Sequence, residues 1–223
     1  MSQFRILDAD PASSPWQRLL DGNARWADGR STAADGRGEG RRSALTQSQN
    51  PYALVLGCAD SRVPAEILFD QGLGDLFVVR TAGQVLDAAV LGSVEYAVQY
   101  LGVELIVVLG HEGCGAVAAA TAVVDEAQVP HGYIRDIAER IAPNVLRARH
   151  EGAVTADEVG GQHALYTAEL LQERSRVVDE AVRRGDVAMV PARYWLGTGA
   201  VTEVHPFSLP GTRRLPVPQA AAA

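Results

Sequence analysis

Residues 52–62 read Tyr-Ala-Leu-Val-Leu-Gly-Cys-Ala-Asp-Ser-Arg, an apolar run that passes directly into a polar segment. Residues 105–115 repeat the arrangement, with Leu-Ile-Val-Val-Leu-Gly followed by His-Glu-Gly-Cys-Gly. Each apolar run is typical of a buried strand in a parallel sheet, and each polar segment follows its carboxyl end. Ligands bind at that edge of an open parallel sheet. We therefore expect the two polar segments to meet in one site.

Potential metal ligands lie in both segments. The chain has two cysteines, Cys58 and Cys114, and His111 precedes the second of them. Two thiolates and one imidazole form a soft donor set that suits tetrahedral Zn²⁺. Three protein ligands leave a fourth position for water or substrate, as in catalytic rather than structural zinc sites. The alternative is that the cysteines are small buried hydrophobic residues, but the ligand types and strand-end placement favour zinc.

Asp60 and Arg62 follow the first cysteine closely and are the candidate catalytic residues. Asp60 can accept the proton of a water molecule at the metal or orient that water. Arg62 can hold Asp60 through a two-point carboxylate–guanidinium contact. If this contact breaks, Asp60 is close enough to Cys58 in sequence to take the fourth metal position. The alternative is that Asp60 and Ser61 cap the following helix, a role that would not require an arginine two residues later.

The motifs Cys58-x-Asp60-Ser61-Arg62 and His111-x-x-Cys114-Gly115 resemble those of the β-class carbonic anhydrases. The similarity covers about residues 14–205 and is densest between 49 and 120. It implies a zinc lyase (carbonate dehydratase) that reversibly hydrates carbon dioxide to bicarbonate and a proton. It further implies an Asp60–Arg62 pair in active forms and Asp60 on zinc in resting forms.

The same resemblance implies a set of substrate-binding residues around the metal. A glutamine hydrogen-bonds the substrate oxygen, apolar residues line a narrow cleft in part from the partner subunit, and one backbone N–H follows the second thiolate. The corresponding residues here are Gln49, Phe77, Ala82, Tyr96 and Gly115. Without the resemblance, the sequence would indicate only an exposed loop residue at Gln49 and ordinary core residues at Phe77 and Tyr96.

Strand and helix patterns alternate along the chain and predict an α/β fold. We expect a mainly parallel central sheet flanked by helices, an N-terminal helical arm and a C-terminal edge hairpin. The expected division is an arm and loop over residues 1–45, a zinc-binding catalytic domain over 46–205, and a disordered tail over 206–223. Within the arm, residues 29–42 are rich in glycine and arginine and predict a solvated loop.

An apolar stripe runs along the arm, formed by Trp16, Leu19, Leu20 and Trp26. Such a stripe packs either on the chain's own core or on a partner. In the resembled family, N-terminal helices extend over the neighbouring subunit, which favours an interface. A homodimer or homotetramer is therefore expected.

Composition restricts the possible partners and compartment. The 223 residues are enough for one sizeable domain, and the net charge of −7 argues against a nucleic-acid or anionic-membrane partner. No apolar run is long enough to span a bilayer, and residues 1–11 lack the pattern of a secretory signal. Two cysteines required as reduced thiolates predict a cytoplasmic protein.

Two other functions compete with carbon dioxide hydration. One is hydrolysis of carbon disulfide or carbonyl sulfide on the same fold, which an assay would distinguish. The other is a non-catalytic module that zinc stabilises. The three-ligand count and the Asp60–Arg62 pair argue against the second.

Overall fold

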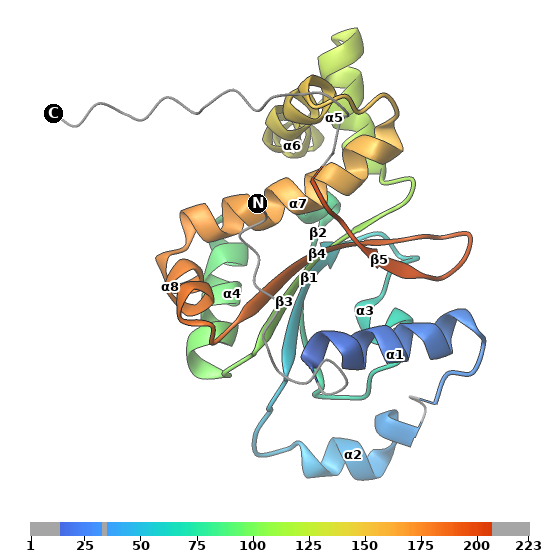
Figure 1. Cartoon of the computed structure of the whole chain (residues 1–223), viewed down its shortest axis with the longest axis vertical. Coiled ribbons are helices and arrows are strands. Elements are labelled where there is room, and N and C mark those ends of the chain that lie inside the picture. Colours follow the sequence, from blue (N-terminus) through green and yellow to red (C-terminus); the bar gives the residue numbers. More distant parts are fainter. Residues whose placement is uncertain (1–13, 33–34, 207–223) are drawn as a thin grey trace, which may run out of the picture.

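Five strands form one sheet in the computed structural model, which describes residues 14–32 and 35–206 (Figure 1). Their order across the sheet is β2-β1-β3-β4-β5, with β1 to β4 parallel and β5 antiparallel to β4. The mainly parallel sheet and its C-terminal edge hairpin are thus confirmed. The strands are β1 (Ala53–Cys58), β2 (Leu76–Thr81), β3 (Leu105–His111), β4 (Ala188–Tyr194) and β5 (Val201–Glu203).

Helices cover both faces of the sheet (Figure 1). The α-helices are α1 (Pro15–Ala27), α2 (Glu39–Ala44), α3 (Ala65–Leu68), α4 (Ala88–Tyr100), α5 (Gly115–Glu126), α6 (Ile134–His150), α7 (Ala156–Arg174) and α8 (Arg176–Arg184). Two short 3₁₀ helices are η2 (Asp35–Arg37) and η3 (Ala82–Gln84). None of the described helices is long and apolar enough to cross a membrane.

Side chains of successive strand residues point to opposite faces of the sheet, so they contribute to two separate hydrophobic cores. Ala53 and Val55 belong to a core with residues of α1, α3, α5 and α6, whereas Leu54 and Leu56 pack with α4 and α8. Helix α7 contributes to both cores. Its buried run lies beside β3 and β4, so side chains of α7 can reach the carboxyl edge of the sheet.

The N-terminal helix α1 packs on the chain's own core. Ser14 caps it by accepting a hydrogen bond from the Gln17 N–H, and Pro15 occupies its first position. Trp16 is 5% exposed and Leu19 is fully buried, and the Trp16 ring meets Phe69 edge-on at 6.4 Å between centroids. For Trp16 and Leu19 the prediction of a subunit interface is therefore wrong, whereas Leu20 and Trp26 are half-buried against the same core. Helical periodicity identified the apolar face but not what it packs against.

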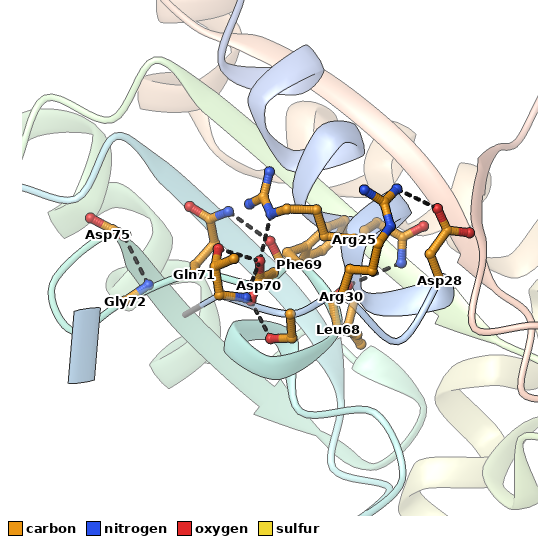
Figure 2. A network of polar contacts seen from close by, with 12 residues as sticks. Arg25, Asp28, Arg30, Leu68, Phe69, Asp70, Gln71, Gly72 and Asp75 are labelled. Atoms are coloured by element: carbon orange, nitrogen blue, oxygen red, sulfur yellow. Dashed lines mark hydrogen bonds and ion pairs between the residues drawn. The ribbon is translucent and has the colours of Figure 1, made fainter. Parts of the chain in front are cut away.

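A buried carboxylate fastens the end of α1 to the turn after α3, as Figure 2 shows. Asp70 accepts hydrogen bonds from Arg25 Nε at 2.6 Å, from the Thr32 N–H at 3.1 Å and from the Ser31 hydroxyl. The Asp70 side chain is fully buried, and its φ of 50° lies in the left-handed region that an aspartate tolerates. These bonds hold the end of α1 and the two residues Ser31 and Thr32 against the turn after α3.

The following segment is more ordered than the predicted solvated loop. It contains η2 and α2, and the guanidinium groups of Arg37 and Arg41 donate to the carbonyls of Gln71 and Leu73. Its residues are mainly exposed, as expected. Residues 1–13 lie outside the described residues, as do residues 207–223 of the predicted disordered tail over 206–223.

Strand register places the two sequence motifs side by side. β1 and β3 are neighbours, with Gly57 opposite Leu109, so both strands end at the same edge of the sheet. Cys58 is the last residue of β1, and His111 is the last residue of β3. The carboxyl edge of the sheet therefore carries both polar segments.

Candidate metal centre

Three buried donor atoms converge at this edge. Cys58 ends β1, His111 ends β3 and Cys114 is the N-cap residue of α5. Their ligand atoms all lie within 4.8 Å of one another, and the two sulfurs are 4.0 Å apart. The two cysteines form no disulfide with each other. One sheet edge and one helix start thus bring together the three residues predicted to bind zinc.

The histidine presents a free lone pair to this cluster. His111 Nδ1 lies 2.8 Å from the Glu112 carbonyl, which can only accept, so Nδ1 carries the hydrogen. Against the opposing effect of burial, contact with the Cys58 sulfur raises the pKa of His111. In the neutral ring, the form that can bind a metal ion, Nε2 is then the unprotonated nitrogen. It is buried and has no hydrogen-bond partner. A buried nitrogen lone pair without a partner is costly in a metal-free core and is what a metal ion requires.

The two sulfurs cannot both ionise easily by themselves. A hydrogen bond from the Cys114 thiol lowers the pKa of Cys58 to about 4, against the opposing effect of burial. The ionised Cys58, together with burial, raises the pKa of Cys114. A second thiolate 4.0 Å from the first therefore needs a cation to offset its charge. The donor set and its electrostatics both fit Zn²⁺.

A carboxylate faces the cluster from the segment after β1. Asp60 Oδ1 accepts from Arg62 Nε at 2.9 Å and Oδ2 accepts from Nη2 at 2.6 Å, which is the predicted two-point contact. These bonds hold the pKa of Asp60 well below its usual range. Asp60 Oδ2 also lies 3.9 Å from His111 Nε2. The capping alternative is not observed, because the N-cap of α3 is Pro64 and has no side-chain cap bond.

Comparison with known proteins identifies the family. The family model for carbonic anhydrase matches residues 53–201. The chain belongs to the carbonic anhydrase family. A carbonic anhydrase from Mycolicibacterium smegmatis is 52% identical over 194 residues, which cover 86% of this chain and 94% of that protein. Carbonic anhydrase 2 from Mycobacterium tuberculosis is 49% identical over 195 residues, or 85% and 92% of the two chains.

Solved structures of carbonic anhydrases share the fold. Coccomyxa β-carbonic anhydrase in complex with acetazolamide is 28% identical and superposes with a TM-score of 0.66, covering 88% of this chain and 86% of that chain. A structure from work on two tetrameric β-carbonic anhydrases of Sordaria macrospora gives a TM-score of 0.67 at 22% identity, covering 85% and 96% of the two chains. The resemblance to β-class enzymes that the two motifs indicated is thereby confirmed.

Other residues fix the loop that carries two of the predicted metal ligands. The Gly113 N–H donates to Asp157 Oδ1 at 2.9 Å, and the buried Arg193 lies 3.2 Å from the same oxygen. Glu112 Oε2 accepts from the Leu196 N–H at 3.0 Å. Sequence reasoning did not single these residues out, because each is joined to the loop by a contact between distant segments.

Arg80 is another site residue that the motifs did not reveal. It stands near the carboxyl end of β2, opposite Gly57 of β1. Its guanidinium donates to the carbonyls of Cys58 at 2.9 Å and Asp60 at 2.6 Å. Arg80 could have been found from the sequence, because it lies at the end of a third predicted strand and strand ends of a parallel sheet share one edge with the first metal motif.

Two of the five implied substrate-binding residues lie at the metal centre. Ala82 begins η3, and the N–H of its neighbour Gly83 points at Cys58 Sγ at 3.3 Å. Gly115 follows Cys114 at the start of α5. The backbone around these two residues therefore contacts the predicted ligands.

The other three lie away from the cluster of their own chain. Gln49 is exposed and precedes β1, whose six residues extend about 20 Å to the metal edge. Phe77 is opposite Leu54, near the amino end of the sheet, and its ring packs against Tyr96 at 6.3 Å. A single chain does not bring these three side chains to the metal centre.

Proposed function

We propose that the chain catalyses the reversible hydration of carbon dioxide to bicarbonate and a proton at a zinc ion held by Cys58, His111 and Cys114. Family membership supports the reaction. One observation carries the metal assignment, namely the buried, unpaired His111 Nε2 that faces two sulfurs in the same cluster. Zinc, when bound, supplies a Lewis acid that makes water nucleophilic near neutral pH.

Asp60 is assigned an orienting role. Its low pKa keeps it ionised in the neutral range, and such a weak base is a poor acceptor for a full proton there. Oδ2 accepts a hydrogen bond from Arg62 Nη2 through one lone pair and faces the cluster at 3.9 Å from His111 Nε2. A second lone pair is then available to accept a hydrogen bond from the attacking water or from bicarbonate. Asp60 would orient that group beside the three donor residues, and Arg62 holds Asp60 in place.

The complete site is proposed to require a second copy of the chain. Gln49, Phe77 and Tyr96 are too far from their own cluster to serve it, so a partner must supply them if they bind substrate. β2 is one of the two edge strands of the described sheet, and its residues are half-buried or exposed. Beside it, Tyr96 and Tyr100 are 46% and 75% exposed and stack at 5.3 Å. An open edge with exposed aromatic rings is a suitable surface for a second copy.

The assembly is a homodimer or homotetramer. The solved Sordaria macrospora enzymes are described as tetrameric. Replacing Tyr96 and Tyr100 together by serine is expected to yield a monomer with little activity, measured by light scattering and by carbon dioxide hydration. A fully active wild-type monomer at assay concentration would contradict the proposal.

Neither competing function has comparable support. The relatives are named carbonic anhydrases, which gives no reason to prefer carbon disulfide or carbonyl sulfide. A purely structural zinc site would have four protein ligands. Because Cys58 and Cys114 must remain reduced to bind the metal, a reducing compartment such as the cytoplasm suits the protein.

The decisive experiment combines metal analysis with stopped-flow hydration of carbon dioxide. Purified wild-type protein is expected to hold about one zinc ion per chain and to hydrate carbon dioxide. Cys58→Ser should lose both properties, whereas the exposed-residue control His131→Gln should keep both. Zinc-loaded wild-type protein that hydrolyses carbonyl sulfide but does not hydrate carbon dioxide would favour the competing enzyme.

A further inference from the structure

One buried histidine lies outside the ligand set but is connected to it. His163 on α7 is 2% exposed, and both of its ring nitrogens have partners on other elements. Nε2 lies 2.8 Å from the Gly83 carbonyl of η3, and Nδ1 lies 2.8 Å from Asn144 Nδ2 of α6. The carbonyl can only accept, so Nε2 carries the hydrogen and Nδ1 accepts from Asn144. Burial lowers the pKa of His163 and so favours this neutral form.

The residue that accepts from His163 also donates to a metal ligand. The Gly83 N–H points at Cys58 Sγ at 3.3 Å. Gly83 and Gln84 have φ values of 64° and 42°, so two successive residues are in the left-handed region. Such a turn is not held by its own backbone preference, because the left-handed region is unfavourable for Gln84. A bond to the Gly83 carbonyl from outside the turn therefore matters for its conformation.

We propose that His163 is a positioning residue of the metal centre, because its Nε2–H holds the Gly83 turn in the orientation that donates a hydrogen bond to the Cys58 sulfur. The inference rests on the proposed zinc site. An N–H bond to a thiolate stabilises the charged sulfur and fixes its direction. Residues that support metal ligands in this way usually strengthen metal binding.

The chain's remaining non-ligand histidines make no such contact with the centre. His131, His150 and His205 are all exposed. Simple core packing would explain the burial of His163, but it would not require both ring nitrogens to be used or the bond to end on Gly83. Packing alone also predicts that a leucine of similar size would serve equally well.

The test compares three variants of the full-length protein. His163→Leu removes the donor at similar volume, and His163→Gln retains an N–H donor on a flexible side chain. His131→Leu is the exposed control. Zinc affinity is measured by competition with a chelator, and the thiolate-to-metal absorption bands are recorded after cobalt replaces zinc. His163→Leu is expected to bind zinc about tenfold or more weakly with shifted cobalt bands. His163→Gln should recover much of the affinity, and His131→Leu should match the wild type.

The inference would be overturned if the His163→Leu variant had the same zinc affinity and the same cobalt bands as the wild type. If that variant does not fold, Asn144→Ala decides, since it removes the bond that orients the imidazole and leaves His163 in place. It is expected to weaken zinc binding in the same direction, and an unchanged affinity and spectrum would count against the inference. Wild-type protein that binds no metal would reject the site and this inference together. Zinc-loaded wild-type protein without hydratase activity would reject only the proposed reaction, because affinity and spectra still test His163.

Discussion

Replacing Gly83 by alanine tests how closely the turn beside Cys58 is packed against its neighbours. An added Cβ would lie 2.7 Å from Ile141 Cδ1 and 2.8 Å from the Ala116 Cβ, so the Ile141 side chain would have to turn away and α5, which carries Ala116, would have to shift. The φ of 64° adds a second cost, because alanine disfavours the left-handed region. Overpacking costs about 1–3 kcal/mol and the backbone term about 1–2 kcal/mol. Together they destabilise the folded chain by about 2–5 kcal/mol.

Gly132→Ala is the matched control. Gly132 has a φ of 63°, but nothing lies within 4 Å of its added Cβ, so only the backbone term applies. In a protein of this size 1 kcal/mol changes the melting temperature by about 2–4 °C. The melting temperature should fall by roughly 4–20 °C in Gly83→Ala and by roughly 2–8 °C in the control. Both are measured on zinc-loaded protein at one concentration, because metal binding and assembly also affect melting.

The two variants should also differ in metal binding. A displaced Gly83 N–H no longer stabilises the Cys58 thiolate, so Gly83→Ala should bind zinc more weakly than Gly132→Ala in a chelator competition. Equal melting temperatures for the two variants would refute the steric reasoning. Equal zinc affinities despite unequal melting would show that the turn contributes to packing but not to the ligand.

Three further predictions concern the same centre. Cys114→Ser should lose most zinc affinity, measured by metal analysis after dialysis, because a neutral hydroxyl is a much poorer ligand than a thiolate. Arg62→Gln should raise the pKa of Asp60 toward its ordinary range and reduce hydration at neutral pH without loss of zinc; wild-type turnover would show that the pair has no catalytic part. Native His163 stays neutral while the unfolded chain protonates below about pH 6.5, so the unfolded state binds more protons there and stability falls with falling pH. The slope is at most about 1.4 kcal/mol per pH unit and should be smaller in His163→Leu, measured by denaturant unfolding at saturating zinc.

The metal cluster was predictable from the sequence because two short rules suffice. Apolar runs at residues 52–57 and 105–110 predict parallel strands, and such strands end at a common edge. The residues that follow each run then share one edge, and they lie close together because β1 and β3 are neighbours in the sheet. Asp60 and Arg62 were equally accessible, since their contact spans two positions of one turn.

Contacts between distant segments were beyond the reach of these rules. The bond from His163 to Gly83 joins residues 80 positions apart, and the contact of Asp157 with Gly113 joins residues 44 apart. The stripe on α1 was misassigned for a related reason. Its spacing is the same whether Trp16 meets Phe69 of its own chain or a second copy, so periodicity alone does not choose between them.

The hydrogen bonds to the two sulfurs affect the Lewis acidity expected of this centre, compared with a centre that has three histidine ligands. Cys58 accepts from the Gly83 N–H, whereas the Cys58 sulfur and burial raise the pKa of Cys114 against the smaller opposing effect of the Ala116 and Val117 N–H groups at the start of α5. Two thiolates cancel the charge of a divalent cation, which weakens its effect on water relative to three neutral ligands. Each N–H would draw charge back from its sulfur, so a bound cation would keep more of its Lewis acidity. The backbone around the ligands therefore opposes the charge that the ligands donate, and the pH dependence of hydration should respond to Gly83 and His163 although neither touches the substrate.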